Sequence, residues 1–304
     1  TDLVQGAIMI IAALLVFVAA LSAVDGGLTG IVATLIRDDP ESVTPWGTLG
    51  MMGALSWYFV FALGLSGQPH IITKLMMSKR VQDARHILPV SVVGYALCAL
   101  LWLSIGLAIR ALVLQGVHPS LNNPDDAAPQ FLQTYAHPLL AGVVFAALFA
   151  AIMSTADSFL NLGAAAIVHD IPRALRGRSL ERELLWARVA TVVIAVGSVF
   201  FVVYSRQDLV ALLGTFGWGT FAAALVPTVT IGFNWKRATA TAANTAIITG
   251  LAVNFAIEIF NVMIPYGING GAIALLVSLT LFFGISLASP APKLDPDIDA
   301  VMDL

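Results

Sequence analysis

Apolar residues gather in eight segments along the chain, and the shorter stretches between them carry most of the polar side chains. A helix that crosses a membrane requires about 20 largely apolar residues, and each segment approaches that length. They run approximately over Leu3–Val24, Gly47–Gly67, Ile87–Ile109, Pro138–His169, Val189–Tyr204, Leu209–Phe233, Ala238–Ile257 and Gly267–Leu287. The pattern predicts an all-α, polytopic membrane protein of about eight transmembrane helices, embedded in a lipid bilayer.

Composition supports this assignment and excludes several classes of protein. Hydrophobic residues make up 59% of the chain, charged residues 11%, and the mean hydropathy is +0.90. No soluble domain of this size could bury that much apolar surface. The single cysteine, Cys98, excludes a disulfide framework or a cysteine metal site. The apolar segments hold no nucleophile–base pair, and the chain has neither a phosphate-binding G-x-x-x-x-G-K-[ST] loop nor a surface for nucleic acid. We therefore do not expect an enzyme.

Positive charge predicts the orientation of the segments. If Thr1 lies in the cytoplasm and the segments alternate, only Arg37, Arg110 and Arg206 fall outside, so twelve of the fifteen basic residues face the cytoplasm. Cytoplasmic loops are enriched in lysine and arginine, so we expect the Thr1 side and the C-terminus to be cytoplasmic. The chain begins almost inside a helix, without the basic region of a signal peptide, which suggests a piece of a longer protein.

Glycine and proline interrupt two of the segments. The second ends in Gly64-Leu65-Ser66-Gly67-Gln68-Pro69, which predicts either a broken helix of the kind that lines transporter sites or a simple helix end. An amphipathic, basic stretch follows over Ile71–Arg85 and suits a helix along the inner membrane surface. The glycine cluster at 214–219 favours close helix packing over a hinge. Residues 1–289 are predicted to form one transmembrane domain, and 290–304 a disordered cytoplasmic tail.

The fourth segment contains the chain's clearest candidate for chemistry. Asp157 is the only charge between Pro138 and Val168, and a carboxylate at that depth usually faces a cavity, an ion or a partner. At helical spacing, one face carries Ala151, Ser154, Thr155 and Ser158. Their oxygens suit a small hard cation. The alternative is a packing face whose hydroxyls bond the carbonyls of their own helix.

Asp2 is a second acidic candidate. It lies at the inner end of the first segment, while Asp157 lies 19 residues into a segment that descends from outside, about 28 Å along its helix. Both carboxylates are therefore expected in the inner half of the membrane, where they could share a cation or where one could hold a proton. An ordinary charged cap at a helix start is the alternative for Asp2.

Three motifs resemble the sodium/solute symporter family, and most closely its sodium/proline branch. They are Gly67-Gln68-Pro69-His70-Ile71-Ile72, Ala151-Ile152-Met153-Ser154-Thr155 and the opening Thr1-Asp2-Leu3-Val4-Gln5-Gly6. The resemblance implies a LeuT-like fold built on two inverted repeats, truncated at its N-terminal side. The chain would then hold the fifth core helix, the second repeat and two extra helices.

The same resemblance implies the site residues. The main sodium site would use Ala151, Ser154 and Thr155 together with carbonyls of the first core helix, which is absent from the chain. A second cation site would use Asp2, Asp157 and Ser158, although serine is more usual at position 157. For the substrate and gating side, the matching positions are Phe61, Ser66, Gly67 and Gln68. The tryptophan and tyrosine of proline transporters match Phe61 and Leu65, so proline as the substrate stays open.

The implied function is sodium-coupled symport of a small organic solute, proline or another amino or organic acid, by alternating access. Sodium would be the coupling ion, and the location a bacterial inner membrane. Two other functions are compatible with the sequence. One is a sensor module, since symporter-like domains also occur fused to signalling kinases, and the other is a degenerate structural membrane subunit.

Overall fold

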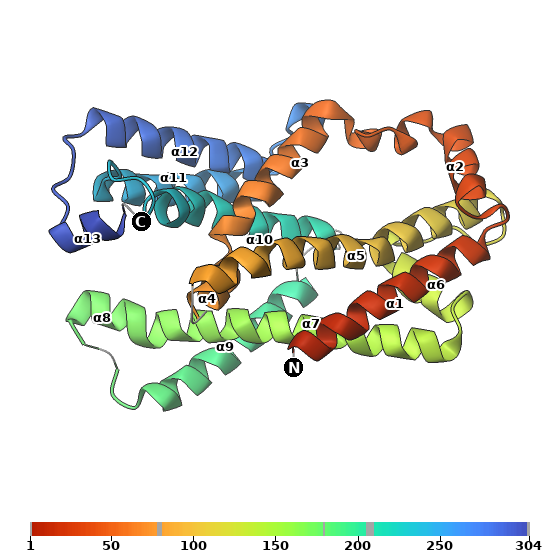
Figure 1. The fold of residues 1–304 in the computed structure, drawn as a ribbon, viewed down its shortest axis with the longest axis horizontal. Helices are drawn as coiled ribbons and strands as arrows, with labels where there is room; N and C mark the ends of the chain where they lie inside the picture. The colour runs from red at the N-terminus through yellow and green to blue at the C-terminus, as the bar shows by residue number, and fades with distance from the viewer. Residues whose placement is uncertain (1, 78–80, 179, 205–209, 303–304) are drawn as a thin grey trace. The chain divides into compact units, whose positions relative to one another are not determined.

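A computed structural model describes residues 2–77, 81–178, 180–204 and 210–302, all of them in helices or connecting segments (Figure 1). The chain divides into two compact units. Unit 1 comprises Thr1–Val43 and Ser78–Asp208, and unit 2 comprises Thr44–Met77 and Leu209–Leu304. Each unit therefore combines segments that are distant in the sequence.

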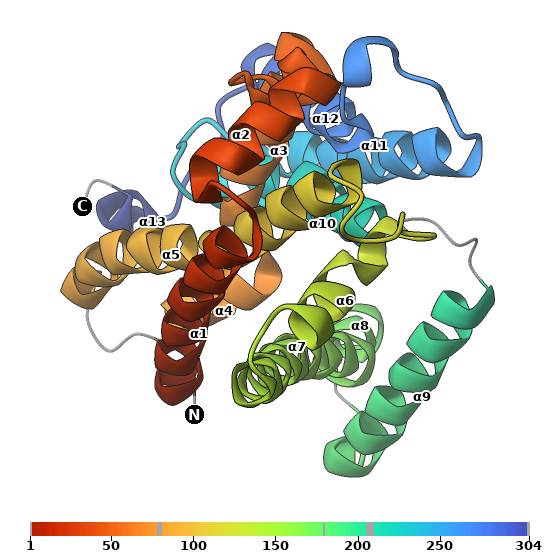
Figure 2. The same cartoon turned by 90° about the vertical axis from the view of Figure 1, so that its right-hand side faces the viewer.

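Unit 1 is built around three long helices. Its elements are α1 (Asp2–Ala23), α2 (Gly27–Asp38), η1 (Pro40–Val43), α5 (Val81–Leu114), η4 (Pro124–Asp126), α6 (Ala127–Thr134), α7 (Pro138–Ala165), η5 (Ala166–Asp170), α8 (Ile171–Arg176) and α9 (Glu183–Tyr204). Helix α1 packs against α5 and α7, and α9 packs against α7 (Figure 2). Fully buried Ala13, Val16, Ala108 and Val144 belong to the core that α1, α5 and α7 share. Small side chains at these positions allow the helices to approach closely.

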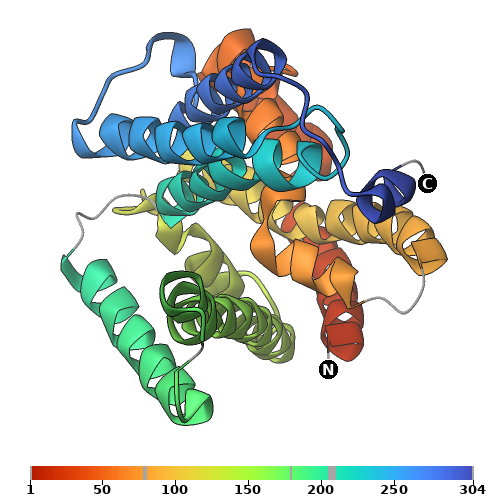
Figure 3. The same cartoon turned by 90° about the vertical axis from the view of Figure 1, so that its left-hand side faces the viewer.

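Unit 2 packs four helices around small residues. Its elements are η2 (Gly47–Leu49), α3 (Gly50–Gly64), η3 (Leu65–Gly67), α4 (Pro69–Met76), α10 (Val210–Leu225), η6 (Val226–Ile231), α11 (Ala240–Ile259), η7 (Pro265–Gly267), α12 (Gly270–Ala288) and α13 (Pro296–Val301). Helices α10, α11 and α12 contact one another, and α3 packs on α10 and α12 (Figure 3). A Cβ atom on Gly219 would lie 2.8 Å from the Cα atom of Gly271. The predicted close packing at the glycine cluster is therefore confirmed at Gly219.

The structure has an irregular stretch after the second segment, where the sequence predicts either a broken helix or a helix end. Helix α3 ends at Gly64, η3 follows, and Gln68 is extended at φ −76° and ψ 116° before α4 starts with Pro69 in its first turn. Proline suits a first turn because its missing N–H would have no partner there. A second irregularity lies in the same unit, where α10 gives way to the π-helix η6 at Val226 and Pro227. Unit 2 therefore contains irregular segments at the ends of two helices, α3 and α10.

The predicted number of spans is confirmed, with differences at their ends. Eight helical segments among the described residues are long and apolar enough to cross a membrane. Helix α5 begins at Val81 and α9 at Glu183, each six residues before the predicted start, since polar residues extend the helices beyond the apolar core. The predicted surface helix over Ile71–Arg85 is divided between α4 and α5, and residues 78–80 lie outside the described part.

The C-terminal stretch differs from its prediction in one respect. Within 290–304, which the composition predicts to be disordered, the structure has the short helix α13. Its start is stabilised locally, because the Asp295 side chain accepts a hydrogen bond from the backbone N–H of Asp297 and Pro296 occupies the first turn. Asp299 also lies 2.7 Å from the Nζ atom of Lys236, in the turn before α11.

Candidate functional site

Ser154, Thr155 and Ser158, which we call the hydroxyl stripe, lie on one face of α7. Ala151, Ser154 and Ser158 are half-buried, while Thr155 and Asp157 are exposed. The hydroxyl of Thr155 donates to the carbonyl oxygen of Ala151 at 3.1 Å, and that of Ser158 donates to the carbonyl oxygen of Ser154 at 3.0 Å. The structure thus contains the hydrogen bonds expected of the packing alternative.

These hydrogen bonds do not exclude a cation site. A hydroxyl has one hydrogen to donate and two lone pairs that accept or coordinate. Because the hydrogens of Thr155 and Ser158 point back to carbonyl oxygens, the lone pairs of the same hydroxyls face away from the helix backbone. Neutral hydroxyl oxygens oriented in this way are suitable ligands for a hard cation. The stripe could therefore contribute ligands to a site completed by another element.

Helix α1 lies against α7 and runs in the opposite direction (Figure 1). Val16 of α1 and Val144 of α7 are fully buried in their shared core. Asp2 begins α1, but its side chain lies outside the described part of the chain. The structure thus pairs the two helices that carry the predicted acidic residues, without testing the second cation site itself.

The substrate-side candidates surround the break between α3 and α4. Gln68 is 1% exposed, and its Nε2 atom donates to the carbonyl oxygens of Gly64 at 3.1 Å and Trp218 at 3.3 Å. Phe61 is exposed and stacks on Trp57 on one side, with the ring of Trp218 5.2 Å away. The side-chain amide of Gln68 therefore stabilises the irregular backbone by hydrogen bonds, whereas Phe61 presents an aromatic surface.

Ser66 and Gly67 are held by α10 and η6. The hydroxyl of Thr230 donates to the carbonyl oxygen of Ser66 at 3.0 Å. A Cβ atom on Gly67 would lie 2.8 Å from the Cγ2 atom of Val226, so position 67 has no room for a side chain. The carbonyl groups released by the break thus find donors within unit 2, as an apolar environment requires.

Trp218 and Thr230 are contacts that the sequence did not single out. Among the described residues, the buried Nε1 atom of Trp218 has no hydrogen-bond partner, and a Cβ atom on Gly64 would lie 2.7 Å from it. The signal available in the sequence was a tryptophan between glycines at 217 and 219, followed by Pro227 and Thr230. Which side chain would contact the break depends on how α3 and α10 pack.

His70 follows the break in α4, outside the eight candidate spans. Burial, and secondly the positive charge of Lys74, lower the pKa of its imidazole below the ordinary value of 6.5. Both effects disfavour the protonated form. His70 beside the break is therefore protonated less readily than a free imidazole.

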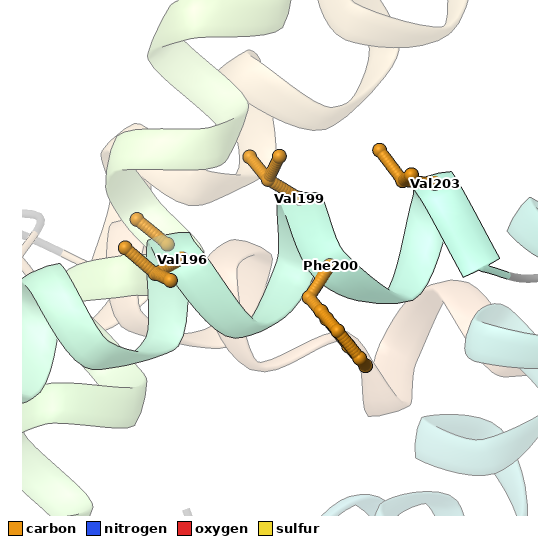
Figure 4. Close-up of a pocket in the computed structure, with 5 residues that line it drawn as sticks. Val196, Val199, Phe200 and Val203 are labelled. Atoms are coloured by element: carbon orange, nitrogen blue, oxygen red, sulfur yellow. The ribbon is translucent and has the colours of Figure 1, made fainter.

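Two other features of the described residues were candidates for a coupling-ion site, and neither provides ligands for sodium. Among the described residues, no group of three or more histidine, cysteine or acidic side chains could hold a metal ion. A hollow of about 450 Å³ lies along α9 and is lined by Ala195, Val196, Val199, Phe200 and Val203 (Figure 4). Its walls are apolar, so it has no ligands for sodium.

Comparisons with known proteins point to one family. The model of the sodium:solute symporter family matches residues 1–250. The chain is 26% identical over 271 residues to the sodium/pantothenate symporter of Haemophilus influenzae, covering 86% of this chain and 55% of that protein. It is 30% identical over 265 residues to the osmoregulated proline transporter OpuE of Bacillus subtilis, covering 83% and 51%. The chain therefore spans about half the length of the curated relatives it matches.

A solved structure supports the fold. A substrate-bound, outward-open Na⁺-coupled sialic acid symporter superposes with a TM-score of 0.71 at 19% sequence identity. The match covers 96% of this chain and 62% of that one. This similarity confirms the predicted LeuT-like helical architecture.

Proposed function

Because the chain belongs to the sodium:solute symporter family, we propose that the protein containing it performs sodium-coupled symport of a small organic solute. The observation that carries the proposal beyond family membership is the hydroxyl stripe of α7, which lies within a membrane-length helix. Sodium is the coupling ion, and the solute and sodium are the binding partners. Residues 1–289 act as one transporter domain, and 290–304 form a cytoplasmic tail.

The main sodium site uses the carbonyl oxygen of Ala151 and the hydroxyls of Ser154 and Thr155. Thr155 and Ala151 already form one hydrogen-bonded turn, which fixes the direction of the hydroxyl lone pairs. The remaining ligands come from the part of the protein that precedes this chain. Because the site is divided between segments, sodium binding favours the conformation that brings them together.

A second cation site involves Asp157 and Ser158 on α7 and Asp2 at the start of α1. Two observations support this pairing. Helices α1 and α7 share a core and run in opposite directions, and Asp2 and Ser158 are each 14 residues from a buried valine of that core, Val16 and Val144 respectively. Equal steps of about 1.5 Å per residue then lead toward the same membrane level. The site binds a second sodium ion or a proton.

The solute is proline or another amino or organic acid. The proline transporters among the relatives and the pantothenate symporter support a small carboxylate-bearing solute. Phe61 offers the aromatic surface beside the break, whereas Gln68, Ser66 and Gly67 shape the backbone around it. The bend at Gly67–Pro69 then acts as the gating element.

Transport proceeds by alternating access in a bacterial inner membrane, with the Thr1 side and the C-terminus cytoplasmic. The basic residues of the predicted inner loops support this orientation. Sodium favours the outward-facing state, which binds the solute better, so the two ligands are thermodynamically coupled. The membrane potential adds about 2.3 kcal/mol per translocated charge per 100 mV.

The test is uptake of labelled proline, pantothenate and sialic acid by the full-length protein in proteoliposomes, with and without an inward sodium gradient. We expect sodium-dependent uptake of at least one solute, and a large loss in Ser154→Ala and Thr155→Ala. Ser198→Ala is the matched control, because Ser198 also donates to its own helix, at Ile194, but lies on α9. In Asp157→Ala, a changed dependence of the uptake rate on sodium concentration would indicate that Asp157 binds a second cation.

Two results contradict the proposal. Uptake that does not depend on sodium excludes symport. Equal activity in Ser154→Ala, Thr155→Ala and Ser198→Ala removes the stripe from the coupling site, even if transport itself is sodium-dependent.

A further inference from the structure

The α8–α9 connection gathers positive charge at the end of a membrane-length helix. The stretch carries Arg173, Arg176, Arg178, Arg182 and Arg188 against Asp170, Glu181 and Glu183. The nearest acidic group of α9, Glu183, binds the Nδ1 atom of His169 at 3.1 Å, and Arg173 approaches His169 at 3.5 Å. Within the described part of the chain, Arg176, Arg178, Arg182 and Arg188 form no ion pair. The segment therefore carries positive charge that its own carboxylates do not neutralise.

Arg188 is the first residue of a stripe on α9 that continues to Val203. At helical spacing it shares a face with Val192, Ala195, Val199 and Val203. The three valines are 61%, 64% and 68% exposed. The opposite face is the packed one: Ala190 is buried against Ala164 and Val168, and Ile194 reaches Gly163 of α7. The arginine and the valines thus share the face that α7 leaves uncovered.

The hollow on α9 overlaps this stripe at Ala195, Val199 and Val203. Val196, Val199, Phe200 and Val203 line it, together with Ala195 (Figure 4). It begins seven residues after Arg188 and ends fifteen residues after it, which corresponds to about 10–22 Å along the helix. One leaflet of a bilayer has an apolar thickness of about 15 Å. A phosphate held at Arg188 would therefore place the far part of an acyl chain in the hollow.

We propose that α9 binds an anionic phospholipid, with Arg182 and Arg188 holding its phosphate and the Ala195–Val203 hollow holding an acyl chain. Arginine suits phosphate because its guanidinium can donate two parallel hydrogen bonds. Trp186, 48% exposed beside the arginines, suits the interface level of the membrane. Charge selects the headgroup, and the apolar stripe distinguishes a lipid from free phosphate.

The experiment uses the full-length protein purified in a zwitterionic detergent. Native mass spectrometry counts bound phosphatidylglycerol and phosphatidylcholine added at equal concentration. We expect phosphatidylglycerol to bind preferentially, and its affinity to fall about fivefold for each arginine removed in Arg182→Gln and Arg188→Gln. Arg37→Gln, an exposed arginine on α2, is the charge-matched control and should bind phosphatidylglycerol like the unmodified protein.

A second pair of measurements tests the acyl-chain part. Val199→Trp fills the hollow and should weaken phosphatidylglycerol binding, while the protein elutes unchanged in size-exclusion chromatography. Inorganic phosphate should compete poorly with phosphatidylglycerol. The proposal is overturned if phosphatidylcholine binds equally well, if Arg182→Gln and Arg188→Gln retain full binding, or if inorganic phosphate displaces the lipid at similar concentration. It is also overturned if Val199→Trp dissociates a dimer and leaves lipid binding unchanged, since a second copy would then occupy this face.

Discussion

Thr230 donates its hydroxyl to the carbonyl oxygen of Ser66 at 3.0 Å, and this bond joins the irregular ends of two helices. Ser66 lies in η3, where α3 loses its regular hydrogen bonds, and Thr230 lies in the π-helix η6 that follows α10. Each irregular segment leaves backbone groups that an apolar environment does not satisfy. A side chain of η6 therefore satisfies a backbone carbonyl group of η3.

The variant Thr230→Val tests this hydrogen bond. It keeps the shape of the side chain but removes the donor to Ser66, so we expect a loss of about 0.5–1.5 kcal/mol in the free energy of unfolding. Thermal unfolding in detergent provides the measurement. Thr245→Val is the control, because the half-buried Thr245 donates to Thr241 within its own helix. Equal destabilisation by both variants would argue against a special role for the Ser66 contact.

Gln68 should behave as a structural brace rather than as a solute ligand. Replacing it by leucine leaves the carbonyl groups of Gly64 and Trp218 without their side-chain donor, which should cost about 1–3 kcal/mol of stability. Gln68→Asn, whose amide is too short to reach both carbonyls, should lower the unfolding temperature as well. A raised KM for solute uptake with an unchanged unfolding temperature would instead indicate direct contact between Gln68 and the solute.

Gly219 and Gly217 make a matched pair. A Cβ atom at position 219 would lie 2.8 Å from Gly271, whereas at position 217 it would meet no atom of the described residues within 4 Å. We expect Gly219→Ala to destabilise the protein by about 1–3 kcal/mol through overpacking of α10 on α12. Gly217→Ala should be neutral or slightly stabilising, because alanine favours the helix. Thermal unfolding of both variants in one detergent decides between close packing and a hinge that needs both glycines.

His70 predicts a pH dependence of stability. Its folded-state pKa is lowered below 6.5, so the unfolded chain binds more protons once the pH falls through that value. The contribution of His70 to stability is therefore complete above pH 6.5 and decreases as the pH falls toward the lower, folded-state pKa. Unfolding temperatures at pH 7.5 and 5.5 should differ less in His70→Gln than in the unmodified protein. The exposed His86 provides a control variant, His86→Gln, and an unchanged pH difference in His70→Gln would contradict the prediction.

The sequence by itself determined the features that depend on local chemistry. Eight apolar stretches of membrane length define the spans, because a helix satisfies its own backbone wherever it lies in the bilayer. Gly67, Gln68 and Pro69 define the break, because proline cannot continue the hydrogen-bonding pattern of a preceding helix. Helical spacing likewise places Ser154, Thr155 and Ser158 near one another without any knowledge of packing.

Tertiary structure decided everything that requires a partner distant in the chain. Two glycines two residues apart look equivalent in the sequence, yet only Gly219 meets Gly271. The carbonyl oxygen of Ser66 finds its donor in Thr230, 164 residues away, and the side-chain amide of Gln68 donates to the carbonyl oxygen of Trp218, 150 residues away. Such pairings depend on how helices cross and on which faces meet, and residue spacing within one helix carries no information about either. The physical reason is that irregular backbone in an apolar environment needs hydrogen-bond partners from other segments, and only tertiary packing brings those segments within reach.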